Sequence, residues 1–242
     1  MECWLLPLGI LCIAFLYSSV GHAGASGYIA ILALSAVPIG EIRPITLTLN
    51  IVVAILGGWN FYRAGHCSIQ LIWPLVIASV PFAFLGGYLK LPNGILHLLL
   101  GTVLWGSAVR FLFRPKEETV LNPPTRPTLL ATGSVLGLLS GLTGTGGGIF
   151  LTPLMLWRKW APTKAVAAAS IVFILANSLS GLAGCFTSSG ALPKVGWALW
   201  VAAIIGGWIG SRWGSLHYSP RWIQRLLALV LLIAGAKLIF IR

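Results

Sequence analysis

The stretch from Ser140 to Pro153 constrains this chain most, because it places a run of glycines between two apolar segments. It reads SGLTGTGGGIFLTP, and the flanking apolar runs are shorter than a comfortable bilayer span. Glycine allows backbone turns that other residues resist, and it leaves N–H and C=O groups open to a ligand. Inside a membrane, irregular backbone is tolerated only where protein or a water-filled cavity covers it. We therefore interpret this stretch, the second elbow, as part of a binding site.

A weaker copy, the first elbow, runs from Ser19 to Tyr28 and reads SVGHAGASGY. We expect the two elbows to form the walls of one site. The alternative is that their glycines are close helix contacts of the G-x-x-x-G kind. That packing role is our prediction for Gly137 with Gly141 and for Gly206 with Gly210.

The composition indicates an all-α polytopic membrane protein. Of the 242 residues, 57% are hydrophobic and 8% charged, and the mean hydropathy is +0.94, which is far from a soluble domain. Apolar runs fall at Trp4–Val20, Tyr28–Gly40, Ile45–Tyr62, Leu71–Leu89, Gly94–Phe113, Leu129–Leu142, Ile149–Trp157, Ala165–Gly184, Val195–Trp213 and Trp222–Ile241. The runs beside the elbows are short for a core of about 30 Å, so each elbow pair is expected to be a re-entrant hairpin or two tilted spans.

The acidic residues argue against enzyme chemistry. All four are glutamates, and the chain has no Asp, which removes a Ser-His-Asp triad and a two-Asp metal site. The four cysteines lie far apart without metal-ligand spacing. We therefore expect no enzyme activity, metal or cofactor. The net charge of +12 comes from basic residues between apolar runs, a pattern of membrane topology and not of nucleic-acid binding.

The basic residues also predict orientation. Eleven fall on one side of the membrane and five on the other, so the positive-inside rule makes the first side cytoplasmic and places both termini outside. The eleven are Arg63, Arg110, Arg114, Lys116, Arg126, Arg158, Lys159, Lys164, Arg212, Arg221 and Arg225. We expect a multi-pass protein of the inner (plasma) membrane, with a first repeat at 1–113, a cytoplasmic linker at 114–127 and a second repeat at 128–242.

The two halves resemble each other when one is shifted by 120 positions. The shift aligns Gly21 with Gly141, Gly24 with Gly144, Gly27 with Gly147, and Gly86-Gly87 with Gly206-Gly207. Five segments per half is an odd number, so the second copy must lie upside down relative to the first. This predicts two inverted-topology repeats, the architecture of many secondary transporters.

Three motifs in the second half, in this order and spacing, resemble the sulfite exporter TauE/SafE family: GGGIFLTPL at Gly146–Leu154, APTKAVAAAS at Ala161–Ser170 and GGWIG at Gly206–Gly210. In the first half, FYRAG at Phe61–Gly65 is similar to the family's basic turn after its third segment. The resemblance covers nearly the whole chain. It implies export of sulfite or small organosulfonates.

A small oxyanion needs hydrogen-bond donors and partial positive charge, which helix N-termini supply. We predict that both elbows and polar residues within the apolar helices bind the anion. The predicted set is Thr143, Gly144, Thr145, Gly146, Gly147, Gly148, Gly24, Ser26, Gly27, Asn50, Ser170 and Asn177. Asn50 and Asn177 have an alternative role in tying helices together.

Coupling and entry involve charged groups. His22 is the one titratable group at plausible membrane depth whose charge changes near neutral pH, so we predict that it couples protons to transport. Arg43 and Lys164 are expected to draw anions toward the two mouths, with interfacial snorkelling as the alternative. The sequence thus predicts an alternating-access exporter of small sulfur anions. An anion-selective channel and a carrier of thiosulfate or sulfate stay open, as does a homodimer.

Overall fold

The computed structural model describes residues 5–19, 21–112, 121–190, 193, 195–216, 232, 236 and 239. Within these residues the prediction of an all-α protein is confirmed, because every regular element is a helix. The helices are α1 (Leu5–Ser19), α2 (Ala25–Leu34), α3 (Ile39–Arg63), α4 (Ile69–Tyr88), α5 (Asn93–Leu112), α6 (Arg126–Thr143), α7 (Gly148–Trp157), α8 (Thr163–Ser189) and α9 (Trp197–Leu216). The predicted segment Trp222–Ile241 lies outside the described residues apart from positions 232, 236 and 239.

Three described helices, α3, α4 and α8, are long and apolar enough to cross a membrane. In contrast, α2 and α7 have 10 residues each, so each rises about 15 Å, half of a hydrocarbon core. The short helices predicted beside the two elbows are therefore present. α6 begins at Arg126, which falls inside the predicted linker 114–127.

The predicted segment Tyr28–Gly40 is wrong in its bounds, since α2 runs from Ala25 to Leu34. The helix ends because Ala36 adopts a left-handed conformation with φ 57°. The N–H of Val37 then donates to the carbonyl of Leu32 at 3.1 Å, which is the closure of a Schellman motif. Because the residue at this position is not a glycine, the sequence did not predict that the helix ends here.

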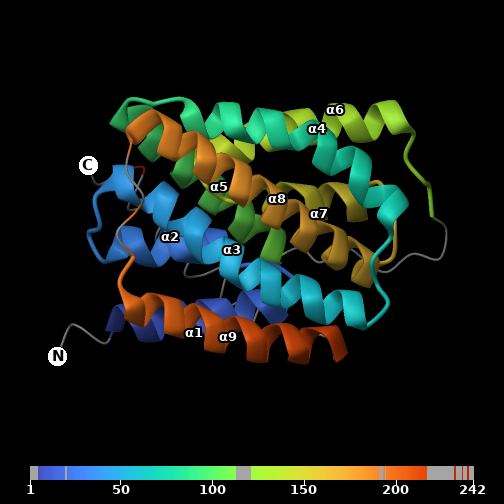
Figure 1. Ribbon diagram of the computed structural model, residues 1–242, viewed down its shortest axis with the longest axis horizontal. Helices are drawn as coiled ribbons and strands as arrows, with labels where there is room; N and C mark the ends of the chain where they lie inside the picture. The colour runs from blue at the N-terminus through green and yellow to red at the C-terminus, as the bar shows by residue number, and fades with distance from the viewer. Residues whose placement is uncertain are drawn as a thin grey trace.

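The helices pack in three layers (Figure 1). α1 and α9 lie side by side at one edge of the molecule, and α4 and α6 lie side by side at the opposite edge. Between them run the two long helices α3 and α8, which contact each other. α4 also packs against α8, and α9 packs against α3.

Glycines allow the outer helix pairs to approach closely. A Cβ at Gly206 or Gly210 of α9 would collide with the carbonyl oxygens of Leu11 and Phe15 in α1. Gly137 and Gly141 of α6 lie in the same way against the carbonyls of Ser79 and Ala83 in α4. The predicted packing role of these four glycines is confirmed.

Candidate functional site

The second elbow reverses the chain between α6 and α7. α6 ends at Thr143, and α7 begins at Gly148. Between them Gly144, Gly146 and Gly147 have φ of 74°, 69° and 79°, a left-handed conformation in which a side chain is unfavourable. The glycine run of this stretch is therefore a requirement of the turn itself.

The turn leaves the first N–H groups of α7 without backbone partners. The first to donate to a backbone carbonyl is that of Phe150, to Gly147 at 3.1 Å. In the part of the chain that the structure describes, the N–H groups of Gly147, Gly148 and Ile149 have no such acceptor, as expected at a helix N-terminus. The helix dipole adds about half a positive charge at this point.

Polar side chains from two long helices and from α6 converge on these glycines. An ideal Cβ at Gly146 would lie 3.0 Å from Ser178 Oγ of α8 and 3.3 Å from Asn50 Nδ2 of α3. One at Gly147 would lie 3.2 Å from Ser140 Cβ of α6. We call this group the α7 N-terminal site: Asn50, Ser140, Ser178, Thr143, Thr145 and the backbone of Gly146–Gly148.

The site is buried, and several of its polar atoms lack partners. Asn50, Ser140 and Ser178 are all fully buried. Among the described residues, neither the two hydroxyls nor the amide atoms of Asn50 make a hydrogen bond. Thr143 and Thr145 bond each other through their hydroxyls at 2.8 Å. Because an unsatisfied buried polar group costs about 1–3 kcal/mol, the arrangement favours a bound ligand that accepts hydrogen bonds.

Two further unpartnered groups lie on the same helices. Thr46, fully buried and without a hydrogen bond in the described part of the chain, lies one turn before Asn50 in α3. Asn177, which we predicted to bind substrate, precedes Ser178 in α8 and is in the same condition. The polar groups thus continue along both long helices beyond the elbow.

The first elbow is filled by aromatic rings instead. Ser26 Oγ bonds the Tyr17 hydroxyl at 2.9 Å, and Gly27 lies against the rings and methyls of Tyr17 and Ile13. Gly24 is left-handed with φ 105°, and a Cβ there would lie 2.9 Å from the Tyr28 hydroxyl. Gly24, Ser26 and Gly27 therefore lie among tyrosine side chains, and the Tyr28 hydroxyl beside Gly24 is buried without a hydrogen bond among the described residues.

His22 connects the first elbow to α7 and α8. Its Nε2 shares a hydrogen bond of 3.0 Å with Thr152 Oγ1 in α7, and Thr152 Oγ1 bonds Ser170 Oγ in α8 at 2.7 Å. All three side chains are buried. Ser170 also lies beside the start of α7, since its carbonyl oxygen would be 3.6 Å from a Cβ at Gly148. The two elbows thus meet through one short helix.

Arg43 borders the second elbow, with its Cγ 2.7 Å from the position of a Cβ at Gly144. Its guanidinium donates to four carbonyls at helix C-terminal ends. Three belong to the end of α4 and the residue after it, and one to the end of α6: Gly87 at 3.1 Å, Leu89 at 3.2 Å, Gly86 at 3.5 Å and Leu142 at 3.5 Å. This is a C-capping position, where a cation is favourable.

Lys164, in the first turn of α8, lies away from the second elbow. Its Nζ donates to Ser215 O, at the C-terminal end of α9, at 3.4 Å. Partial burial, together with the positive charge of Lys164, lowers the pKa of His66 in the loop after α3. The structure therefore brings Arg43, but not Lys164, to the second elbow.

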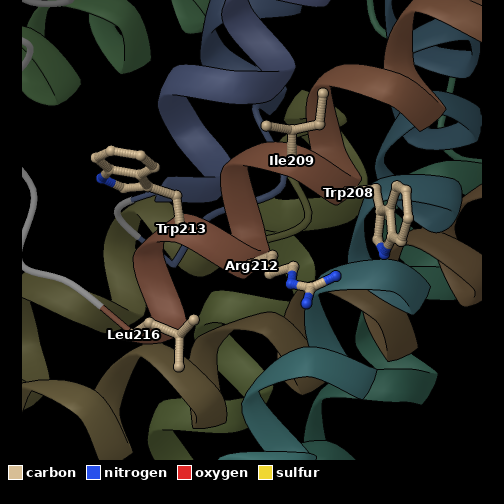
Figure 2. Close-up of a pocket in the computed structure, with 5 residues that line it drawn as sticks. All are labelled: Trp208, Ile209, Arg212, Trp213 and Leu216. Atoms are coloured by element: carbon tan, nitrogen blue, oxygen red, sulfur yellow. The ribbon is translucent and has the colours of Figure 1, made fainter.

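Two grooves lie away from the elbows, on the outside of the bundle. One, of about 310 Å³, is lined by side chains of α9: Trp208, Ile209, Arg212, Trp213 and Leu216. Figure 2 shows Trp208 and Arg212 on one side of that helix and Trp213 on the other. The second, of about 420 Å³, includes Trp59 and Tyr62 of α3 and Leu175 of α8. Their linings are mostly apolar, and Arg212 is the cation in the lining of the first.

The predicted binding set did not include Ser140, Thr46, Thr152 or Ser178. Each is a small hydroxyl residue inside an apolar run, and such residues commonly bond the preceding helical turn. Ser140, Thr46 and Ser178 are distinguished only by the structure, in which each hydroxyl is buried without such a bond. Thr152 is marked by a contact between residues 130 positions apart.

Comparisons with known proteins identify the family of this chain. The family model described as sulfite exporter TauE/SafE matches residues 6–238. The probable membrane transporter protein y4hK of Sinorhizobium fredii (strain NBRC 101917 / NGR234) is 38% identical over 241 residues, which cover 97% of each chain. The probable membrane transporter protein YjnA of Bacillus subtilis (strain 168) is 26% identical over 218 residues, 80% of this chain and 82% of that protein. No solved structure matches significantly. The family resemblance seen in the motifs is confirmed, and the chain belongs to the sulfite exporter TauE/SafE family.

Proposed function

We propose that this membrane transporter exports small sulfur-containing anions, sulfite or organosulfonates, across the plasma membrane by alternating access. Its family and its relatives, named as probable membrane transporters, support the transport role. The family description, sulfite exporter, supports the substrate class.

The observation that carries the proposal is the α7 N-terminal site. Unpartnered, fully buried donors from α3, α6 and α8 surround glycines whose N–H groups open a helix. A sulfur oxyanion presents several acceptor oxygens around one atom, so it can accept from the Asn50 amide, the Ser140 and Ser178 hydroxyls and the backbone at once. An apolar substrate would leave these groups unsatisfied.

The helix contacts support the inverted repeats on which alternating access would depend. α4 packs against α6 and α8, as α9 packs against α1 and α3, and α3 contacts α8. This is the pattern expected of two exchanged halves related by a two-fold axis. Helix starts correspond at spacings of 123 for α2 and α7, 124 for α3 and α8, and 128 for α4 and α9, which differ from the sequence shift of 120. By helix starts, the counterpart of Gly24 is Gly147 and that of His22 is Thr145.

His22 is the proposed coupling group. Its hydrogen bond to Thr152 places a titratable ring between the first elbow and α7. Protonation changes what the ring can donate, and therefore the hydrogen bonds around Thr152. We expect His22→Gln to flatten the pH dependence of transport without abolishing it. Complete loss of substrate binding by a folded His22→Gln protein would instead make His22 a direct ligand.

The test is uptake by proteoliposomes across a panel of sulfite, thiosulfate, sulfate, sulfoacetate and taurine. A carrier of sulfur anions shows saturable flux and counterflow for at least one of the anions, and Ser178→Ala lowers that flux. Ser134→Ala is the matched control, since Ser134 is only half-buried on α6 and its hydroxyl donates to Leu130 O in its own helix. Large single-channel currents would indicate the anion-selective channel. Absence of flux for every anion would contradict a transport role for these substrates.

A further inference from the structure

We propose that the α7 N-terminal site accepts monoanions and rejects dianions, an inference that rests on the proposed function. It follows from the charges at the site. The nearest atoms to a Cβ at Gly146 or Gly147 come from uncharged side chains: Ile174, Ser178, Asn50, Phe173 and Ser140. Donors are therefore present without a cation among them.

The nearby cation, Arg43, is offset by the helix ends that it caps. Its guanidinium donates to carbonyls at the C-terminal ends of α4 and α6, and each such end carries about half a negative charge. The unit charge of Arg43 is thereby balanced. The remaining positive charge at the second elbow is that of the N-terminus of α7, about half an elementary charge. The site can compensate much of one negative charge but only a small part of two.

Burying a second uncompensated charge is expensive, because the desolvation cost rises with the square of the charge. Hydrogen bonds to neutral donors recover part of this cost for a monoanion. For a dianion of the same size we expect binding weaker by at least about a hundredfold. The proposed substrates are then hydrogensulfite and organosulfonates that carry one negative charge, and sulfate, thiosulfate, sulfoacetate and the sulfite dianion are excluded.

Sulfite offers a direct test because it changes between monoanion and dianion near neutral pH. Proteoliposomes are given a fixed subsaturating concentration of labelled sulfite, methanesulfonate or sulfate between about pH 6 and pH 9. Methanesulfonate is a monoanion throughout this range, and sulfate is a dianion. We expect the ratio of sulfite flux to methanesulfonate flux to fall about tenfold per pH unit above neutrality. Sulfate flux is expected to stay about a hundredfold below that of methanesulfonate.

The methanesulfonate measurement separates titration of the substrate from titration of the protein. Ionisable side chains on the described parts of α3, α6, α7 and α8 and in the first elbow are Glu41, Arg43, Tyr62, Arg63, Arg126, Lys164, Cys185, His22 and Tyr28. Of these, Arg43 borders the elbow and His22 reaches α7 through Thr152. Any change in these groups alters methanesulfonate flux as well and cancels in the ratio. Repeating the series with His22→Gln should leave the ratio unchanged.

Ser178→Ala tests whether the preference for monoanions arises at the α7 N-terminal site, and Ser134→Ala is its control. It should lower sulfite and methanesulfonate flux by one common factor of about ten. Sulfate flux equal to that of methanesulfonate, or a flux ratio that rises with pH, would overturn the inference, as would methanesulfonate flux unaffected by Ser178→Ala. If none of the three anions moves, the proposed function fails. Binding of methanesulfonate over sulfate to the purified protein then still decides the charge preference.

Discussion

His22 and Thr152, which are 130 positions apart in the sequence, share a buried hydrogen bond of 3.0 Å. The bond joins the first elbow to α7, the helix that the second elbow opens. Thr152 extends the connection to Ser170 in α8 at 2.7 Å. One hydroxyl therefore links the first elbow to α7 and α8.

Thr152→Val should destabilise the protein by about 1–3 kcal/mol, because it removes the hydroxyl shared by His22 and Ser170 in a buried place. Valine has nearly the same shape as threonine, so the loss reports the hydrogen bonds of the hydroxyl. Thermal unfolding in detergent measures it. Thr187→Val is the matched control, since Thr187 is exposed on α8 and bonds its own helix at Ala183. Equal midpoints for the two variants would show that the connection adds no stability.

Arg43→Gln should destabilise by about 1.5–3 kcal/mol, because charge-assisted bonds to the C-terminal carbonyls of α4 and α6 are lost. Arg63→Gln is the control on the same helix: Arg63 lies over the exposed Trp59 ring at 5.3 Å, a contact worth about 0.5–1 kcal/mol. The measurement is again thermal unfolding. Unchanged stability of Arg43→Gln with reduced flux would mean that Arg43 acts on the anion alone, as the sequence predicted.

The helical architecture was largely predictable, because hydropathy and glycine spacing report on it directly. The short α2 and α7 follow from the length of the runs beside the elbows. The close contacts at Gly137 and Gly206 follow from G-x-x-x-G spacing. The end of α2 was not predictable, because Ala36 adopts a left-handed conformation that the local sequence does not require.

The grouping of the polar residues was not predictable. The sequence treated both elbows and their hydroxyl residues as one set, but a side chain's partner depends on how helices cross. Ser26 is paired with Tyr17 and Ser170 with Thr152, whereas Asn50 is left unpaired beside Gly146. The binding role of each of these residues stays a prediction.

The stability of the folded protein should fall as pH falls through the range just below the ordinary pKa of histidine. Partial burial and the charge of Lys164 lower the pKa of His66, so the folded state binds the proton less readily than the unfolded state. The loss begins near the unfolded pKa of about 6.5 and is complete below the folded pKa. His66→Gln should remove this part of the pH dependence, and Lys164→Gln should reduce it. Unfolding midpoints that rise as pH falls in wild type but not in His66→Gln would contradict the prediction.

Both termini should face away from the cytoplasm, and the linker 114–127 should face it. The reason is the distribution of basic residues under the positive-inside rule. Single cysteines at Thr119 and Arg242, in a chain whose Cys3, Cys12, Cys67 and Cys185 are replaced, give the measurement. An impermeant thiol reagent added to whole cells should label position 242 and spare position 119. Labelling of both positions from the same side of the membrane would contradict the model of two repeats with five segments each.

Gly147→Ala should weaken anion binding by roughly tenfold to ten-thousandfold. The residue has φ 79°, and a Cβ would lie 2.7 Å from Phe173 Cε1 and 3.2 Å from Ser140 Cβ. The new methyl group therefore strains the turn and moves the first N–H groups of α7 away from the anion. Losing one or two charge-assisted hydrogen bonds, at about 1.5–3 kcal/mol each, gives the expected range. Thr145→Val, which removes one hydroxyl and keeps the shape, should cost less.

Gly58→Ala in α3 is the control for Gly147→Ala, because the nearest atom to its Cβ is Ile171 Cγ2 at an ordinary 3.5 Å. Binding should be unchanged, and α3 should gain up to about 1 kcal/mol from helix propensity. Gly206→Ala should instead lower stability, since its Cβ meets the carbonyl of Leu11 in α1. The measurement is affinity for sulfite and methanesulfonate of purified, monodisperse protein in one detergent. If Gly147→Ala binds like wild type while Gly206→Ala does not, the anion binds at the contact between α1 and α9, and the second elbow is only a hinge.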